Sequence, residues 1–220
     1  MPEPLILNLV LFLPVIGIAL LLYVPAGRED LMRGLSFWVM AAQFALTVWL
    51  YARFDPVNPG LQFETRLPWI ADWGVYYQIG LDGYNVLLVL LTAVLGPLVV
   101  ASAFTAITKD VKLFYAMVLG IQFTMVGTFV AQDLFLFYLF WEAMLIPMFF
   151  IIGIWGGERR IYATIKFVLY TAFGSILMLA ALGQRASRVL GRIQTGNLQF
   201  YAFLVLAGLA AALWWSLRHV

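Results

Sequence analysis

Glu142 is the residue of this sequence best placed to do chemistry, because it is the one charged residue of a long apolar run. The run extends from Leu134 to Trp155 and reads LFLFYLFWEAMLIPMFFIIGIW. A helix of this length can cross a bilayer. A carboxylate at hydrocarbon depth is costly and usually faces a protein interior or a wet cavity, where it can relay protons. The alternative is a neutral, protonated glutamic acid that packs by hydrogen bonding to another helix.

The neighbours of Glu142 along the chain describe its expected surroundings. Tyr138 and Ile146 share its face of a helix, at i−4 and i+4. Pro147 lies five residues after Glu142 and cannot donate a hydrogen bond to the carbonyl of Ala143, so we expect a weakened helix beside the acid. A carbonyl freed in this way, next to a carboxyl group, suits a few ordered water molecules.

Lys166 is the second candidate, as a proton relay. It lies about five residues into a helix that is expected to begin near Ile161, which is about 8 Å deep, whereas Glu142 lies nearer 18 Å from the cytoplasmic end of its own helix. A difference in depth of about 10 Å argues against a direct ion pair and leaves water as the link. The alternative is that Lys166 snorkels to the inner interface.

The composition places these residues in an integral membrane protein. The chain is 64% hydrophobic and 11% charged, whereas soluble domains carry about a quarter charged residues. Its net charge of +2 gives no reason to expect nucleic acid. The absence of cysteine excludes thiolate metal sites and disulfides, and the single histidine, His219, argues against a histidine metal site. No glycine-rich phosphate loop follows a strand, so we expect no bound nucleotide.

Seven apolar runs have the length of a spanning helix. They lack the alternation typical of barrel strands, so we predict an all-α, polytopic membrane helix bundle with about seven transmembrane helices. The first run follows MPEP instead of a basic segment, which predicts a retained helix and not a cleaved signal peptide. The predicted spans are 4–24, 34–52, 85–105, 114–131, 134–155, 161–182 and 198–217.

Basic residues in the short loops predict the orientation. Three alternate loops each carry two of them, and the positive-inside rule places these loops in the cytoplasm. The N-terminus and the long loop 53–83 then lie outside. This loop is rich in tryptophan and tyrosine, which favours an extramembrane hairpin resting on the lipid headgroups. The basic pairs are Arg28 and Arg33, Lys109 and Lys112, and Arg159 and Arg160.

The other polar residues fit structural roles. Asp82 and Asp133 each stand just before a predicted span, where a carboxylate can cap a helix N-terminus. Four polar residues inside the spans are expected to form hydrogen bonds between helices. These are Gln43, Gln122, Thr124 and Thr171.

The segment QDLFLFYLFWEAMLIPMFFIIGIWGGERRIYATIKFVLYTAFGSILML, residues 132–179, resembles the antiporter-like M subunit (chain 4) family of proton-pumping NADH:quinone oxidoreductase, respiratory complex I. The segment YYQIGLDGYNVLLVLLTAVLGPL, residues 76–98, is similar to the third-helix signature of this family, and the resemblance covers about residues 1–183. It implies that Glu142 stands at the essential glutamate of the fifth helix and Lys166 at a lysine early in the sixth.

The resemblance further implies a place in a larger enzyme. The chain would be a membrane-arm subunit that contributes to proton translocation through a buried glutamate and binds no cofactor itself. NADH, flavin, iron–sulfur clusters and quinone would be handled elsewhere in the complex. The expected partners are the L-, N- and K-type membrane subunits and the lipid bilayer, and the expected location is a bacterial inner membrane, with an organellar inner membrane as the alternative.

The chain also departs from the family pattern. The family has fourteen spans, and a lysine on a broken seventh helix modulates its glutamate, whereas the match here ends after six spans. The segment 184–197 carries Arg185, Arg188 and Arg192 where alternation expects an outside loop, and the tail resembles the end of the related L subunit. We therefore expect a join near Leu182–Arg185.

This join defines three predicted regions and leaves the activity of the chain open. Residues 1–183 would form the N-terminal part of an antiporter-like membrane domain, 184–197 a basic linker and 198–217 a C-terminal anchor helix. Such a chain would be truncated relative to the fourteen-helix fold and incomplete as a pump on its own. Two alternatives are a component of a multi-subunit cation/proton antiporter and a non-transporting structural membrane fragment.

Overall fold

The computed structural model of the chain describes residues 3–190. Within this part, six stretches of helix are long and apolar enough to cross a membrane, and they correspond to the first six predicted spans. The predicted helical membrane bundle is thereby confirmed for the described residues, and the predicted seventh span, 198–217, lies outside them. The helices are α1 (Glu3–Tyr23), α2 (Glu29–Arg53), α3 (Asn85–Ala106), α4 (Val111–Val130), α5 (Leu134–Ala143), α6 (Leu145–Trp155) and α7 (Arg160–Leu190).

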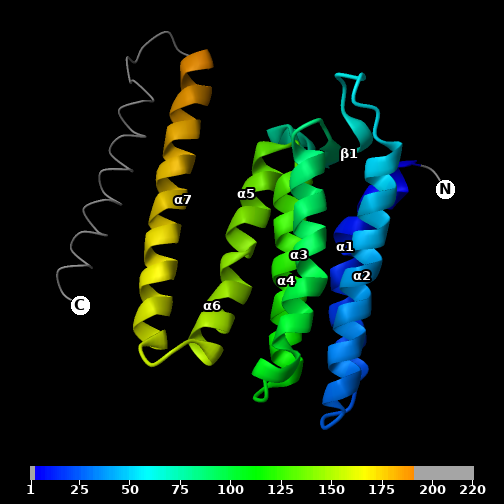
Figure 1. Cartoon of the computed structure of the whole chain (residues 1–220). Helices are drawn as coiled ribbons and strands as arrows, with labels where there is room; N and C mark the ends of the chain where they lie inside the picture. Colours follow the sequence, from blue (N-terminus) through cyan, green and yellow to red (C-terminus); the bar gives the residue numbers. More distant parts are fainter. Residues whose placement is uncertain (1–2, 191–220) are drawn as a thin grey trace. The chain divides into compact units, whose positions relative to one another are not determined.

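The chain divides into two compact units, and the boundary follows Ile161. In the first unit, α1 packs against α2 and α4, and α3 packs against the same two helices, so the four helices share one core (Figure 1). That core has a cluster at each end. One is centred on residues such as Leu7 and Val126, and the other on residues such as Leu21 and Leu119.

The long loop between α2 and α3 folds into a two-stranded antiparallel sheet. Strands β1 (Gln62–Ile70) and β2 (Val75–Leu81) are joined by a short 3-10 turn, Ala71–Trp73. Gly74 follows this turn with φ 65°, a left-handed conformation that glycine adopts at little cost. The predicted hairpin is thus present. Its two strands lie between α2 and α3, so they replace no part of a predicted helical span.

Hydrogen bonds attach this hairpin to the helices beneath it. The hydroxyl of Tyr77 donates to Oδ1 of Asn8 on α1 at 2.7 Å, and Nδ2 of Asn8 donates to Oγ1 of Thr65 at 2.8 Å. The backbone N–H of Gln132, in the turn before α5, donates to the carbonyl of Gln78 at 2.8 Å. The hairpin is therefore hydrogen-bonded both to α1 and to the turn before α5.

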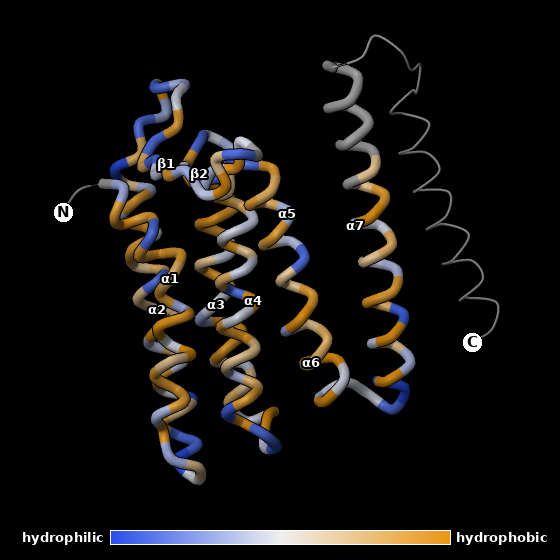
Figure 2. Tube along the Cα trace, turned by 180° about the vertical axis from the view of Figure 1, so that it is seen from behind, coloured by the Kyte–Doolittle hydropathy of each residue, from blue (hydrophilic) through white to orange (hydrophobic). Residues whose placement is uncertain are grey.

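The opposite end of α1–α4 is formed by the α1–α2 and α3–α4 turns, residues 24–33 and 107–112, and we call it the basic end. Figure 2 shows hydrophilic positions in these turns and in the hairpin, with apolar helix between them. Here α2 begins at Glu29, five residues before the predicted span, because its acidic first turn suits a helix N-terminus and Glu29 pairs with Arg33 at 2.9 Å. The predicted cytoplasmic location of this end stays a prediction.

Helix α7 is the described part of the second unit. It continues through Leu190, so the first seven residues of the predicted linker, 184–190, are helical. The sequence explains this difference, because GQRASRVL has no proline and contains good helix formers. The rest of the linker lies outside the described residues.

Candidate functional site

The helix that carries Glu142 lacks one regular backbone hydrogen bond just after it, while its backbone keeps right-handed helical angles. Helix α5 ends at Ala143, Met144 links the two segments with φ −64° and ψ −26°, and α6 begins at Leu145. The cause is Pro147, which has no N–H to donate to the carbonyl of Ala143. The predicted weakening of the helix beside the acid is therefore confirmed.

Packing of α5 and α6 on α4 determines which way Glu142 faces. The ring of Phe140 occupies space that a β-carbon on Gly127 would overlap, and Pro147 lies near Gly120 at a distance that would leave a β-carbon in ordinary contact. Phe140 and Pro147 are both buried. Because successive helical residues are about 100° apart, Glu142 lies about 200° round the helix from Phe140. Its side chain therefore leaves α5 on the side turned away from α4.

The carboxyl group of Glu142 is only partly satisfied. The residue is half-buried, and its Oε1 atom is buried without a hydrogen-bond partner among the described residues. Tyr138, one turn earlier on the same face, is close enough to interact electrostatically with this carboxyl group. A buried carboxyl oxygen without a hydrogen bond is costly, so it favours a hydrogen-bond partner from outside the described part of the chain.

Two buried glutamines in the same unit, Gln43 and Gln122, form hydrogen bonds with residues of other helices. Nε2 of Gln122 donates to Oε1 of Gln43 at 2.8 Å and to the carbonyl of Thr92 at 3.2 Å. Nε2 of Gln43 in turn donates to the carbonyl of Val10 at 2.8 Å. This network joins α1, α2, α3 and α4, and it confirms the predicted hydrogen bonding between helices for both glutamines.

The same prediction is wrong for the two threonines. Thr124 donates to the carbonyls of Gly120 and Ile121, at 3.1 and 2.9 Å, and Thr171 donates to the carbonyl of Phe167 at 2.8 Å. All of these acceptors belong to the helix that carries the threonine. The short threonine side chain reaches the carbonyl one turn earlier more easily than a neighbouring helix.

The predicted helix cap is confirmed for Asp133, whereas Asp82 lies two residues before Tyr84, the N-cap of α3, and its side chain stabilises the turn there. Oδ1 of Asp82 accepts hydrogen bonds from the N–H groups of Tyr84 and Asn85, at 2.8 and 2.7 Å. Oδ1 of Asp133 accepts from Phe135 and Leu136, at 2.8 and 3.1 Å, at the start of the helix that bears Glu142. Asp133 also reaches the hairpin, because its Oδ2 accepts from the N–H of Tyr76 at 3.2 Å.

Lys166 lies on α7, six residues after its start at Arg160. Its Nζ atom is 4.3 Å from the centre of the Tyr162 ring, one turn closer to the helix N-terminus. This contact is a cation–π interaction, and it directs the ammonium toward the interface, as snorkelling would. Lys166 and Glu142 belong to different units, and the relay role of Lys166 stays a prediction.

Asn8 is a structural residue that the sequence analysis passed over. It accepts from Tyr77 and donates to Thr65, and so fixes the hairpin on α1. An asparagine in an apolar run is the signal that could have identified it, because such a residue needs a polar partner.

Comparisons with known proteins cover the regions that contain both candidate residues. A family model described as NADH:quinone oxidoreductase/Mrp antiporter, TM, matches residues 131–212. NADH-quinone oxidoreductase subunit M of Rhodobacter capsulatus is 46% identical over 181 residues, which cover 80% of this chain and 35% of that protein. NADH-ubiquinone oxidoreductase chain 4 of Chondrus crispus is 36% identical over 170 residues, which cover 77% of this chain and 35% of that protein.

A solved structure shares the fold. A chain in respiratory complex I from Thermus thermophilus with bound NADH superimposes with a TM-score of 0.67 and 34% sequence identity. The superposition covers 84% of this chain and 36% of that one. The present chain therefore spans about a third of the length of the relatives that it matches.

Proposed function

Because the chain belongs to the family of antiporter-like M subunits (chain 4) of NADH:quinone oxidoreductase, respiratory complex I, we propose that it contributes to proton translocation coupled to electron transfer. The observation that carries this proposal is the carboxyl group of Glu142. One of its oxygens is buried without a hydrogen-bond partner among the described residues, and the regular helical hydrogen bonding is interrupted at Met144, two residues later. A group in this state can take up a proton and release it when a partner stabilises its charge.

The residues around Glu142 support a proton path toward the hairpin. Helix α5 begins at Leu134, directly after Asp133 beside the hairpin, so Tyr138 lies between Glu142 and that end of the helix. A tyrosine hydroxyl both donates and accepts hydrogen bonds, so Tyr138 can pass a proton to or from the carboxyl group. On the other side, Pro147 leaves the carbonyl of Ala143 available as an acceptor.

We further propose that the chain works as one subunit among several. Electron transfer from NADH through flavin and iron–sulfur clusters to quinone would take place on other subunits. The chain would lie beside L-, N- and K-type membrane subunits in a bacterial inner membrane, with its basic end in the cytoplasm. Lys166 is a lower-ranked relay in this scheme, because its ammonium contacts Tyr162 near the start of α7.

Replacing Glu142 with glutamine tests the proposal in the assembled enzyme. The variant keeps the size of the side chain and removes the proton, so proton translocation driven by NADH oxidation in membrane vesicles should fall by about tenfold or more. The free energy of unfolding should change by less than about 0.5 kcal/mol. Glu158→Gln is the matched control, because Glu158 is an exposed loop residue. Unchanged translocation in an assembled Glu142→Gln complex would contradict the proposal.

A second candidate function is a role in a multi-subunit cation/proton antiporter. The matching family model supports it, because its description names both NADH:quinone oxidoreductase and the Mrp antiporter. Co-purification from the native membrane separates the two functions. Flavin and iron–sulfur subunits in the purified complex would favour the first function, and a set of small hydrophobic subunits without redox centres would favour the second.

A further inference from the structure

A cavity of about 310 Å³ lies between α3, α4 and α6, within the first unit. Gln122 and Thr92 form part of its wall, and two exposed residues of α3, Leu95 and Val99, border it. Gln122 is the twelfth of the 20 residues of α4, so at about 1.5 Å per residue the cavity lies near the middle of the membrane span. A ligand of this cavity must therefore dissolve in the bilayer.

One hydrogen-bond acceptor in the wall has no donor. The carbonyl of Val10 accepts from Nε2 of Gln43 at 2.8 Å, and the carbonyl of Thr92 accepts from Nε2 of Gln122 at 3.2 Å. Because a carbonyl can only accept, these two contacts fix which terminal atom of each amide is the nitrogen. Nε2 of Gln122 also donates to Oε1 of Gln43 at 2.8 Å. Oε1 of Gln122 is thereby left without a hydrogen bond from residues 3–190.

This oxygen is accessible from the cavity. Gln122 is only 5% exposed, and the cavity is open space that it borders. Its Oε1 is not one of the wholly enclosed unpaired atoms of the described residues, which belong to Arg33, Tyr115 and Glu142. Gly96 leaves room beside the amide, because a β-carbon there would lie 3.2 Å from Nε2 of Gln122. A buried acceptor without a donor is costly, so a donor that enters the cavity would be bound.

The rest of the wall determines what kind of donor fits. Thr92 donates its hydroxyl hydrogen to the carbonyl of Leu88 at 2.8 Å, so it offers a ligand no donor. The other lining side chains are apolar, which leaves a water molecule too few polar partners. Three of them are methionines, Met40, Met125 and Met148, and methionine sulfur makes favourable contacts with aromatic rings. The wall therefore suits an aromatic molecule with a single donor.

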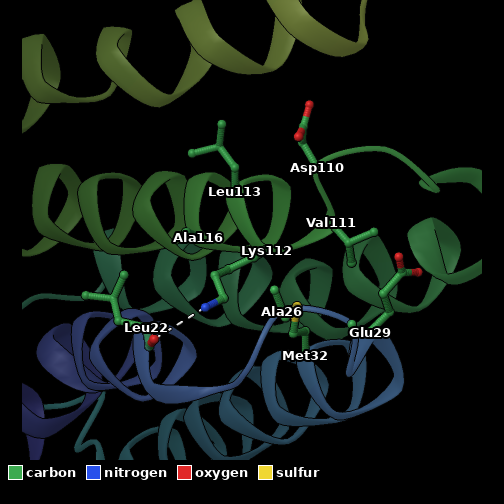
Figure 3. Close-up of a pocket in the computed structure, with 10 residues that line it drawn as sticks. Leu22, Ala26, Glu29, Met32, Asp110, Val111, Lys112, Leu113 and Ala116 are labelled. Atoms are coloured by element: carbon green, nitrogen blue, oxygen red, sulfur yellow. Dashed lines mark hydrogen bonds between the residues drawn. The ribbon is translucent and has the colours of Figure 1, made fainter.

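The cavity at the basic end lacks this combination (Figure 3). There Nζ of Lys112 donates to the carbonyl of Leu22 at 3.3 Å, and the carboxylate of Asp110 is directed away from that ammonium. The charged groups of that cavity do not converge on one ligand. The wall beside Gln122 differs, because it presents one acceptor within apolar surroundings.

We propose that the cavity beside Gln122 binds a phenol, an apolar aromatic molecule with one hydroxyl group. The hydroxyl would donate to Oε1 of Gln122, and the ring would pack against the methionines. A cavity of about 150 Å³ can hold benzene, so about 310 Å³ suits a phenol with a short alkyl chain. Ketones and anions do not fit, because they would bring another acceptor to the acceptor in the wall.

Photoaffinity labelling in native membranes tests this proposal. A para-alkylphenol with a diazirine in its alkyl chain would label the chain, and mass spectrometry would identify the labelled residues. We expect label on the segments of α3, α4 and α6 that line the cavity. Unlabelled para-butylphenol should block this labelling at about fivefold lower membrane concentration than para-butylanisole, which lacks the hydroxyl hydrogen. Equal blocking by the two compounds, or label confined to other segments, would overturn the proposal.

Replacing Gln122 with methionine tests the acceptor itself. The variant keeps the length of the side chain and removes the oxygen, so the fivefold advantage of para-butylphenol should disappear. Blocking by para-butylanisole should stay unchanged, because this compound makes no hydrogen bond to the oxygen. A general loosening of the helices would affect both compounds alike. A preference for the phenol that persists in Gln122→Met would exclude the oxygen as its acceptor and refute the proposal.

Val99→Phe keeps the test decisive if Gln122→Met fails to fold. Val99 is exposed, so the fold should tolerate a larger side chain there, and the ring narrows the cavity that Val99 lines. Labelling should fall by about tenfold, because the ligand is then overpacked. Leu98→Phe is the matched control, because Leu98 is also exposed but does not line the cavity. Equal labelling of the two variants would show that the phenol binds elsewhere.

Discussion

Helix α5 carries one carboxylate at each end, and the two have opposite surroundings. Asp133 caps the start of the helix and accepts hydrogen bonds from three backbone N–H groups, those of Phe135, Leu136 and Tyr76. Glu142 is the penultimate residue of the same helix, and its Oε1 is buried without a hydrogen bond from the described residues. The carboxylate at the start of α5 is therefore bonded into the fold, whereas the carboxyl group near its end keeps an oxygen without such a bond.

This difference separates structural from chemical roles for polar groups in apolar segments. The Gln43–Gln122 pair resembles Asp133, because its N–H donors meet partners on neighbouring helices. Such groups stabilise the fold only while their partners stay in place. Oε1 of Glu142 has no such partner on the described part of the chain, so replacing this side chain should leave the packing of α5 on α4 intact.

The largest loss of stability is expected for Asp133→Ala. The substitution removes the cap of α5 and leaves the N–H of Tyr76 without its acceptor, so the free energy of unfolding should fall by about 2 kcal/mol. Equilibrium unfolding in mixed micelles measures this change. Asp133→Asn is the control, because asparagine also caps helices well. If Asp133→Ala lowered the free energy of unfolding no more than Glu142→Gln does, the two carboxylates would not differ in their structural contribution.

A smaller loss is expected for Gln122→Leu, which tests the amide network. The substitution leaves Oε1 of Gln43 and the carbonyl of Thr92 without the donor that they share. Hydrogen bonds between helices in membranes contribute modestly, so the free energy of unfolding should fall by about 1 kcal/mol. Combining this change with Gln43→Leu should cost less than the sum of the two single changes. Strict additivity would show that the two amides act independently.

Much of this arrangement follows from local sequence patterns. The apolar runs predict the six described spans because length and hydropathy suffice for a membrane helix. Asp133 is recognisable as a cap because it directly precedes such a run. Pro147 predicts the missing hydrogen bond to the carbonyl of Ala143 because the absent N–H is a property of the residue itself.

Other features depend on contacts between distant segments and could not be predicted in the same way. The bond between Tyr77 and Asn8 joins residues 69 positions apart. The direction of Thr124 depends on competition between its own helix and its neighbours, and the cavity at the basic end depends on how two turns meet. The side of α5 on which Glu142 lies becomes evident only from the close approach of Phe140 to Gly127.

Titration of Tyr77 tests how firmly the hairpin, which also contacts Asp133, is attached to α1. Burial raises the pKa of Tyr77 from 10.0 to about 12, so the unfolded chain loses this proton at lower pH than the folded chain. The contribution to stability is present below pH 10 and is lost as the pH rises toward 12, because a tyrosinate cannot donate to Asn8. Tyr77→Phe should abolish this pH-dependent loss, whereas Tyr84→Phe, at a residue that is 88% exposed, should keep it. Ultraviolet absorbance of tyrosinate measures the titration, and a transition of Tyr77 near pH 10 would show that the hairpin does not shield its hydroxyl.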